Sequence, residues 1–383
     1  MELQGPAKSP QLRILFLHRS ETGGHAAAAQ AMVDEFSHYP DVQAESLNLL
    51  SVASKQTQAS QHKLSGLVTK TFPGLRKWGF DLAFKGSKIA CGIAGLALDH
   101  QARNSDDELR AIQERKPDII VATHSPTGRM LSYWAEHGDL KVPIYSIPTD
   151  FRTHRMWKQD AIQHYFVAPG GSKADLVGFG VKPEDISETG IPIRAVTPSR
   201  LTPSQLKESL GLDPDKATVL VTGGSLGLQP YAKLVDQLQK LPQDFQIVCV
   251  TAKNSTAKAE LEALAPAQHP LHVTGTVQNL NEYIQASDVV LTKPGGLTCA
   301  EILAQQKPMV FAELYQGLET PLIARMVEAG VAVAGQTPEQ TAQKVGQILG
   351  DTQSTLRARA AELSRPDSAR LIARQLLEKF RSS

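Results

Sequence analysis

The sequence contains little cysteine, and its cysteines do not form pairs. Cys91, Cys249 and Cys299 lie far apart, with no CxxC motif among them. This spacing excludes a small disulfide-stabilised scaffold and argues against a structural zinc site. Unpaired cysteines are typical of the reducing cytoplasm, and we expect the protein there.

The chain also lacks a long apolar run and an excess of charge. The opening segment MELQGPAKSPQ has no hydrophobic stretch of the signal-peptide kind. The longest uncharged apolar stretch, residues 89–98, is about half of the ~20 residues that a membrane-spanning helix needs. We therefore expect no transmembrane segment. A formal net charge of +1 over 383 residues argues against a nucleic-acid partner.

What the sequence does contain is a repeated unit of strand, glycine loop and helix. Residues 12–17 form an apolar run that ends in the turn Thr22-Gly23-Gly24-His25, and an alanine-rich helical stretch follows to Phe36. Further elements of this half are predicted as strands at residues 117–123, 143–147 and 165–168 and a helix at residues 172–179.

The same unit restarts in the second half. Residues 218–222 run into the loop Gly223-Gly224-Ser225-Leu226-Gly227, and Pro294-Gly295-Gly296 opens a helix over residues 298–305. Valine and isoleucine runs that alternate with helices predict two doubly wound α/β domains with a cleft between them, joined by the Pro/Ser-rich residues 197–204. The other predicted elements are helices at 231–241 and 320–329 and strands at 246–251, 271–274, 289–292 and 309–312.

Residues 61–98 break this pattern because they are basic and aromatic. Six lysines and arginines stand against one acid, Asp81. Such a mixture predicts docking on an anionic membrane surface, although a helical hairpin whose aromatic side chains face the domain core remains an alternative. The residues concerned are Lys63, Lys70, Arg76, Lys77, Lys85 and Lys88, interleaved with Phe72, Trp78, Phe80 and Phe84.

Eight motifs occur in an order that resembles the monogalactosyldiacylglycerol synthase and processive diacylglycerol glucosyltransferase family. They are TGGH, THSPTGR, TDFRTHRMW, YFVA, TGIPIR, VTGGSLG, TKPGGLTCAE and GLE, and the resemblance extends from Ile14 to the RPDSARLIA stretch that begins at Arg365. It implies a GT-B fold, in which two Rossmann-like domains face each other across a cleft. It also implies a UDP-sugar donor, a diacylglycerol-type acceptor, inversion at the anomeric carbon, and no metal or other cofactor.

On this resemblance, residues 1–197 form an acceptor- and membrane-binding domain and residues 198–366 form the nucleotide-sugar domain. A helix within residues 367–383 is expected to return to the first domain, as in the relatives. We expect a hinge at residues 197–204, because the two domains must close for transfer.

The strongest donor-site candidate is the helix start at Gly295, Gly296, Leu297 and Thr298. Glycines let the backbone approach a phosphate, and helix N-terminal amides favour its charge. By resemblance, Glu301 on the same helix binds the ribose hydroxyls; an ordinary helix with a solvated glutamate is the alternative reading.

Other donor contacts are assigned to loops. Gly223, Gly224 and Ser225 follow a buried strand and are assigned to the diphosphate or the sugar. Arg194 would balance the leaving diphosphate, unless it is an exposed linker arginine. By resemblance, Val277 lies in the loop that faces the base, and Gly317 and Glu319 contact the transferred sugar. Leu318 replaces a glutamine of the family, which leaves the sugar open.

Two residues are candidates for the base that activates the acceptor hydroxyl. His25 closes the first glycine loop beside Gly24, itself a candidate for donor binding, and imidazole suits proton transfer at neutral pH. The alternative is that His25 only caps its helix or contacts the loop. Asp150 follows a predicted strand and is either the alternative base, although a carboxylate is the weaker one, or orients His25. His154 is a candidate contact for acceptor or phosphate, Trp157 is expected to pack in the core, and His124 is expected to be structural.

The sequence therefore predicts an inverting hexosyltransferase at the cytoplasmic face of the membrane, which moves a hexose from a UDP-sugar to a diacylglycerol-type lipid. Two other enzymes remain possible: an N-acetylglucosaminyltransferase that acts on a polyprenyl-diphosphate-linked sugar, and a sugar-nucleotide 2-epimerase. A non-catalytic nucleotide-sugar binder is the third alternative, against which His25, Asp150 and Glu301 argue.

Overall fold

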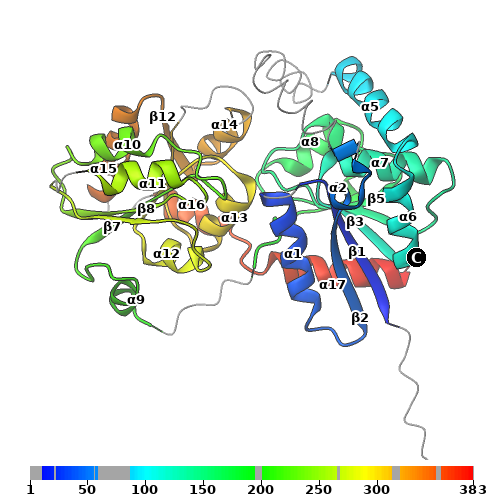
Figure 1. Cartoon of the computed structure of the whole chain (residues 1–383), viewed down its shortest axis with the longest axis horizontal. Coiled ribbons are helices and arrows are strands. Elements are labelled where there is room, and N and C mark those ends of the chain that lie inside the picture. Colours follow the sequence, from blue (N-terminus) through cyan, green and yellow to red (C-terminus); the bar gives the residue numbers. More distant parts are fainter. Residues whose placement is uncertain are drawn as a thin grey trace, which may run out of the picture. The chain divides into compact units, whose positions relative to one another are not determined.

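The computed structural model describes residues 11–20, 23–55, 57–58, 87–194, 201–264, 268–312, 320–350 and 355–382. The chain divides into two compact units (Figure 1). The first comprises Met1–Thr149, Thr153–Arg194 and Asp367–Ser383, and the second comprises Asp150–Arg152 and Ala195–Pro366.

The first unit contains a parallel sheet of six strands in the order β2-β1-β3-β4-β5-β6. These are β1 (Leu12–His18), β2 (Val42–Asn48), β3 (Ile119–Ala122), β4 (Ile144–Ser146), β5 (Ile162–Phe166) and β6 (Ile186–Ser187). Its helices are α1 (Gly24–Phe36), α2 (Leu49–Val52), α5 (Lys88–Arg103), α6 (Asp106–Arg115), α7 (Ser125–Glu136), α8 (Ser172–Gly178) and α17 (Ser368–Ser382), with short 3-10 turns η1 (Arg155–Trp157) and η2 (Pro183–Asp185).

Both faces of this sheet are covered, which explains its continuous apolar strands. In β1, Leu15 and Leu17 belong to a core cluster with Trp134 of α7, while Ile14 and Phe16 belong to a second cluster with side chains of α1 and α17. Neighbouring residues of a strand point to opposite faces, so a strand buried on both sides needs apolar residues at every position.

The second unit also contains a parallel six-stranded sheet, in the order β12-β11-β10-β7-β8-β9. Its strands are β7 (Ala217–Thr222), β8 (Phe245–Val250), β9 (Leu271–Thr274), β10 (Val289–Thr292), β11 (Met309–Ala312) and β12 (Ala332–Gly335). Its helices are α9 (Pro203–Ser209), α10 (Tyr231–Leu238), α11 (Ser255–Glu262), α12 (Leu280–Ala286), α13 (Gly296–Ala304), α14 (Thr320–Glu328), α15 (Pro338–Gly350) and α16 (Thr355–Leu363). The α/β prediction, with one doubly wound sheet in each half, is confirmed.

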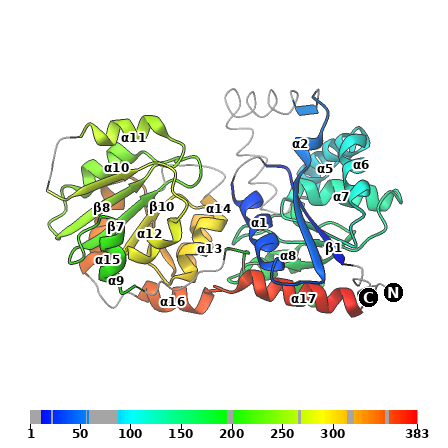
Figure 2. The same ribbon diagram turned by 60° about the horizontal axis from the view of Figure 1, so that its bottom comes forward.

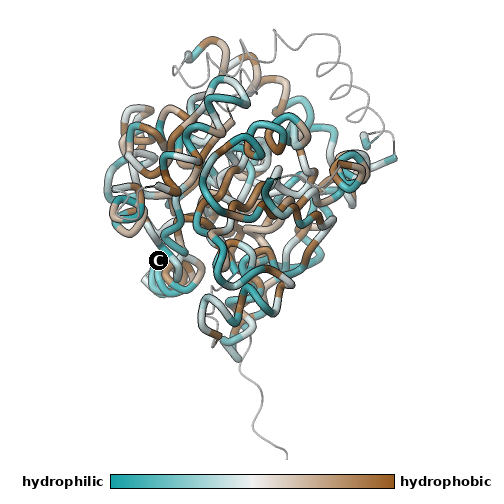
Figure 3. Tube along the Cα trace, turned by 90° about the vertical axis from the view of Figure 1, so that its left-hand side faces the viewer, coloured by the Kyte–Doolittle hydropathy of each residue, from teal (hydrophilic) through white to brown (hydrophobic). Residues whose placement is uncertain are grey.

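The last helix, α17, packs on the first unit. It lies beside α1 in Figures 1 and 2, and Ile372, Ala373 and Leu376 are buried in the same cluster as Ile14 and Phe16. The Ser368 hydroxyl, at the start of α17, donates to the Ile191 carbonyl oxygen at 2.8 Å. Coloured by hydropathy, the helices alternate along the trace between brown and teal, as expected when one face is buried and the other is exposed (Figure 3).

The structure corrects the sequence prediction at the linker. Residues 195–200 lie outside the described residues, but Pro203 and Ser204 already belong to α9. Thr202 caps this helix: its side chain accepts from the Gln205 N–H at 3.3 Å, and the Gln205 side chain accepts from the Thr202 N–H at 2.9 Å. This reciprocal capping box is a helix start, and the Pro/Ser composition concealed it.

Within the described residues, no helix is long and apolar enough to cross a membrane.

Candidate active site

His25 lies at the carboxyl edge of the first sheet, in the first turn of α1. Its Nδ1 is 2.8 Å from the Thr123 carbonyl oxygen and 2.8 Å from the Thr149 hydroxyl. Thr123 directly follows β3 and Thr149 follows β4, the two strands next to β1 on that side of the sheet. A carbonyl oxygen only accepts, so Nδ1 carries the proton and Nε2 keeps the lone pair. The fold thus fixes the tautomer that a general base needs.

Three further histidines surround His25. The His124 ring lies 4.5 Å from the His25 ring, centroid to centroid. Burial lowers the pKa of all three: that of His124 falls well below its ordinary value, that of His154 falls to about 4, and that of His18 is also lowered. Charge repulsion from His25 lowers each of these pKa values further. These three imidazoles are therefore neutral near pH 7.

The depressed pKa of His154 makes the stability of the first unit depend on pH. Because the unfolded chain binds a proton on this histidine below about pH 6.5 and the folded chain does so only near pH 4, stability falls as the pH drops through this window. We expect a slope of at most about 1.4 kcal/mol per pH unit from this group. Tryptophan fluorescence during urea unfolding measures it, and His154→Phe flattens the slope.

The matched control for this experiment is His38→Phe, because His38 is exposed. The control variant keeps the wild-type slope between pH 6.5 and 4. A His154→Phe slope equal to that of wild type would contradict a buried, neutral His154.

The other predicted residues between β4 and the linker lie as follows. Asp150 is next in the chain to Thr149, whose hydroxyl contacts His25. The Arg194 guanidinium pairs with Asp34 of α1 at 3.2 Å, and its side chain is 63% exposed. So exposed a pair is weak, about 0–1 kcal/mol, and does not exclude a diphosphate contact. Trp157 is buried in the core, as expected.

In the second unit, the glycine loop after β7 folds tightly on itself. The Leu228 N–H donates to the Gly223 carbonyl oxygen at 3.0 Å, and Asn254 Nδ2 donates to the Gly227 carbonyl oxygen at 2.9 Å. A Cβ atom at Gly227 would lie 1.9 Å from the Thr251 carbonyl oxygen, and one at Gly223 would lie 2.5 Å from the Leu228 nitrogen. These two glycines are therefore required by the loop itself, whereas Ser225 at its tip is exposed.

The second glycine loop leads into α13, whose first residue is Gly296 after the N-cap Gly295. The helix therefore begins two residues earlier than predicted, so Leu297 and Thr298 lie in its first turn. Glu301 follows one turn later and is half-buried. Val277 lies between the edge strand β9 and α12 and is also half-buried. None of these positions tests the predicted donor contacts, which remain predictions.

The sequence motifs did not single out Thr123, Thr149 and Lys293 as site residues. Thr123 and Thr149 contact His25, which lies about a hundred positions away in the chain, and no local motif reveals such a contact. Lys293 directly follows β10, and its side chain runs along both glycine loops: Cε would lie 3.2 Å from a Cβ at Gly224, and Nζ 3.6 Å from a Cβ at Gly295. One signal in the sequence could have identified Lys293: it directly follows a predicted parallel strand, and ligands bind at the carboxyl ends of such strands.

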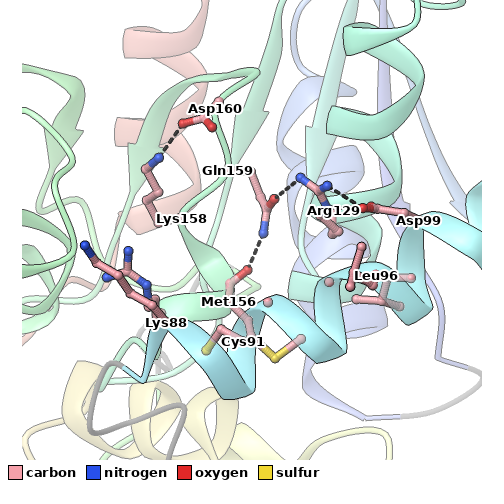
Figure 4. A pocket seen from close by; sticks show the side chains of 13 residues that line it. Lys88, Cys91, Leu96, Asp99, Arg129, Met156, Lys158, Gln159 and Asp160 are labelled. Carbon is pink, nitrogen blue, oxygen red and sulfur yellow. Dashed lines mark hydrogen bonds and ion pairs between the residues drawn. The ribbon is translucent and has the colours of Figure 1, made fainter.

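A cavity of about 480 Å³ lies between α5, α7 and η1 (Figure 4). Arg129 of α7 holds α5 in place by donating from Nε and Nη2 to the two oxygens of Asp99, at 2.6 Å each. Lys88, Arg155 and Lys158 also line this cavity.

Helix α5 also carries three exposed apolar side chains: Ile89, Ile93 and Leu96 are 79%, 66% and 70% exposed. We call these three residues the apolar stripe of α5.

Comparison with known proteins gives the family. A family model described as monogalactosyldiacylglycerol (MGDG) synthase matches residues 25–193, and the glycosyltransferase family 28 C-terminal domain matches residues 218–317. The chain is 30% identical to a processive diacylglycerol beta-glucosyltransferase from Bacillus thuringiensis (strain Al Hakam) over 270 residues, which cover 70% of this chain and 69% of the relative. The chain belongs to the monogalactosyldiacylglycerol synthase and processive diacylglycerol glucosyltransferase family.

A second relative of the same name, from Staphylococcus aureus (strain Newman), is 28% identical over 244 residues. That match covers 63% of this chain and 62% of the relative, so the chain spans less than two thirds of its length. The domains matched in both halves are those of glycosyltransferases, and the chain is accordingly an enzyme of that class.

Solved structures show that this family member has the GT-B fold. It resembles a putative UDP-N-acetylglucosamine 2-epimerase from Listeria monocytogenes with a TM-score of 0.62 at 14% identity, covering 97% of both chains. It resembles CalG4, the calicheamicin glycosyltransferase, with a TM-score of 0.61 at 14% identity, covering 97% of this chain and 98% of that one. At such identities the likeness concerns the fold alone. The GT-B prediction is confirmed, and the facing of its domains across a cleft remains a prediction.

Several residues with predicted roles lie outside the described residues. They are Thr22 of the first glycine loop, Gly317, Leu318 and Glu319 of the sugar-contacting loop, and residues 61–86 of the basic aromatic segment. Among the described residues of this glycosyltransferase, no group of three or more His, Cys, Asp and Glu side chains is placed to hold a metal ion.

Proposed function

We propose that this glycosyltransferase moves a hexose from a UDP-sugar to the free hydroxyl of diacylglycerol or of its glycolipid product. Its relatives are named processive diacylglycerol beta-glucosyltransferases, and the family model of its first half is named for a galactosyl product. The observation that carries the proposal is the fixed tautomer of His25, because acceptor activation needs a base with a free lone pair.

We propose the following reaction at this site. The acceptor hydroxyl gives its proton to Nε2 of His25 while its oxygen attacks the anomeric carbon of the hexose. The bond from that carbon to the diphosphate oxygen breaks, and UDP leaves with the electron pair. Attack from the face opposite the diphosphate inverts the configuration. Asp150 remains the competing base.

The donor half of the chemistry is proposed for the second unit. The N-terminal amides of α13, beyond Gly295, bind the diphosphate, and Glu301 binds the ribose. We further propose that no metal ion takes part, with protein cations balancing the phosphate charge. Each unit thus supplies one part of the reaction.

Extraction of lipids after incubation with radiolabelled sugar nucleotides tests the function. The donors are UDP-glucose, UDP-galactose, UDP-glucuronate and UDP-N-acetylglucosamine, with diacylglycerol in mixed micelles as acceptor. We expect label from UDP-glucose or UDP-galactose in a chloroform-soluble, alkali-labile glycolipid. Label that stays in the water phase as an epimerised sugar nucleotide would instead identify an epimerase.

The acceptor never leaves the bilayer, so we propose that the enzyme works as a peripheral protein at the anionic, cytoplasmic face of the membrane. Two features of the described residues support this proposal. The apolar stripe of α5 is exposed on one side of its helix, and Lys88 and Arg155 line the cavity beside it. Apolar side chains insert at the lipid interface, while each cation gains about 1 kcal/mol near an anionic leaflet.

Replacing Ile89, Ile93 and Leu96 together with serine is expected to weaken vesicle binding. Partial insertion of each side chain contributes about 0.5 to 1 kcal/mol, so the partition coefficient falls about tenfold or more. Flotation with vesicles of phosphatidylglycerol and phosphatidylcholine measures it. The control replaces three exposed but scattered side chains, Val177, Leu264 and Val327, with serine and leaves binding unchanged. Equal binding of both triple variants would refute the membrane role of α5.

A further inference from the structure

Lys293 is the cation of the second unit that lies between its two glycine loops. It is the first residue after β10, and β10 pairs with β7 so that Thr292 lies opposite Thr222. The loop that begins at Gly223 and the loop that contains Gly295 therefore leave the sheet side by side, at its carboxyl edge. In an open parallel sheet, ligands bind at this edge.

The path of the Lys293 side chain depends on glycine at position 224. Gly224 has φ +69, a left-handed conformation, and a Cβ there would lie 3.2 Å from Cε of Lys293. The lysine chain thus packs along bare backbone, and its ammonium group ends near Gly295, the N-cap of α13. The described structure places an ammonium group, a left-handed glycine and a helix N-terminus together.

Other lysines of this unit are used differently. Nζ of Lys307 donates to the carbonyl oxygens of Gln285 and Ser287 at 2.8 Å each, and Nζ of Lys207 donates to the Lys216 carbonyl oxygen at 2.7 Å. Ser287 and Lys216 precede β10 and β7, so these two lysines stabilise the amino edge of the sheet. Lys293 is at the opposite edge, where a substrate binds.

We propose that Lys293 binds the diphosphate of the nucleotide sugar and stabilises the charge that develops on it as the sugar departs. The bond between the anomeric carbon and the diphosphate oxygen breaks, its electron pair passes to that oxygen, and the ammonium group donates a hydrogen bond without giving up its proton. A charge-assisted hydrogen bond of this kind is stronger in the transition state than in the bound substrate. The inference rests on the proposed function, because it assumes a UDP-sugar donor.

The test compares UDP and uridine as ligands of the wild-type enzyme and of Lys293→Met, by calorimetry. Methionine keeps an unbranched side chain along Gly224 and removes the charge. We expect UDP to bind about 10- to 100-fold more weakly to the variant, as for loss of a hydrogen bond between charged groups, with uridine binding unchanged. We expect kcat with the UDP-sugar to fall as well, and Lys293→Arg to recover part of both losses.

The matched control is Lys240→Met. Lys240 follows α10, pairs with Asp236 at 2.8 Å, and lies toward the amino edge of the sheet, where the C-terminal ends of the covering helices lie. This variant keeps wild-type affinity for both ligands.

The outcomes separate the two proposals. Equal UDP affinity of wild type and Lys293→Met, or an equal loss of uridine affinity, would overturn the role of Lys293 and leave the proposed function standing. A wild-type enzyme that binds neither UDP nor a UDP-sugar would overturn the proposed function itself.

Discussion

Replacing His25 with alanine is expected to lower kcat for glycolipid formation by about 10²- to 10⁴-fold, the usual contribution of a general base. UDP affinity should not change, because α13 and Glu301, which we propose to bind the diphosphate and the ribose, belong to the second unit and His25 belongs to the first. Initial rates at saturating UDP-sugar and acceptor, together with calorimetry of UDP binding, measure both quantities.

Two further variants decide what His25 does. Thr149→Val removes the hydroxyl 2.8 Å from Nδ1 and leaves the Thr123 carbonyl oxygen in place, so it should lower kcat by much less than His25→Ala. Asp150→Asn tests the competing base. If His25→Ala keeps more than about a tenth of wild-type kcat while Asp150→Asn loses about 10²-fold or more, the base is Asp150 and His25 is a structural residue.

Replacing Gly227 with alanine is expected to destabilise the second unit by about 2 to 5 kcal/mol. The new methyl group would lie 1.9 Å from the Thr251 carbonyl oxygen and 2.8 Å from Cβ of Asn254, and φ is +62 at this residue. Overpacking costs about 1 to 3 kcal/mol, and a left-handed conformation adds about 1 to 2 kcal/mol for an L-residue.

Two buried tryptophans make this prediction easy to assign. Trp134 and Trp157, the tryptophans among the described residues, belong to the first unit, so their fluorescence reports that unit, whereas far-ultraviolet circular dichroism reports both. In urea, Gly227→Ala should shift part of the dichroism transition to lower concentration and leave the fluorescence transition in place.

Gly211→Ala is the matched control for Gly227→Ala. Gly211 also has a left-handed conformation, with φ +73, but a Cβ there would meet no atom within 4 Å. This variant isolates the cost of backbone conformation, about 1 to 2 kcal/mol. If the free energy of unfolding falls equally in both variants, close packing at Gly227 contributes nothing, and only the backbone conformation requires glycine there.

The strands that the sequence did not predict share one property. β2, β6 and β12 each lie at an edge of their sheet. An edge strand has only one neighbour and is partly exposed, so β2 reads VQAESLN and lacks the continuous valine and isoleucine run of a central strand. The central strands β1, β3, β7 and β10 were found because burial on both faces requires such a run.

The candidate site was predicted only where a local motif carries it. His25 and Gly295 stand in glycine loops that follow apolar runs, and this order is visible along the chain. Lys293 stands in the same motif as Gly295, but composition does not tell where a flexible lysine side chain points. Packing along Gly224, which lies 69 positions earlier in the chain, decided that.

The sequence by itself determined the two α/β units, the glycine loops at their strand ends and the family, because these depend on local periodicity and on motifs in order. Only the tertiary structure decided which nitrogen of His25 carries the proton, since the contacts of Nδ1 come from Thr123 and Thr149, which follow neighbouring strands. It also decided which glycines the backbone requires and where α17 packs. Parallel strands bring residues that are distant in sequence to one edge, and contacts made there have no local pattern.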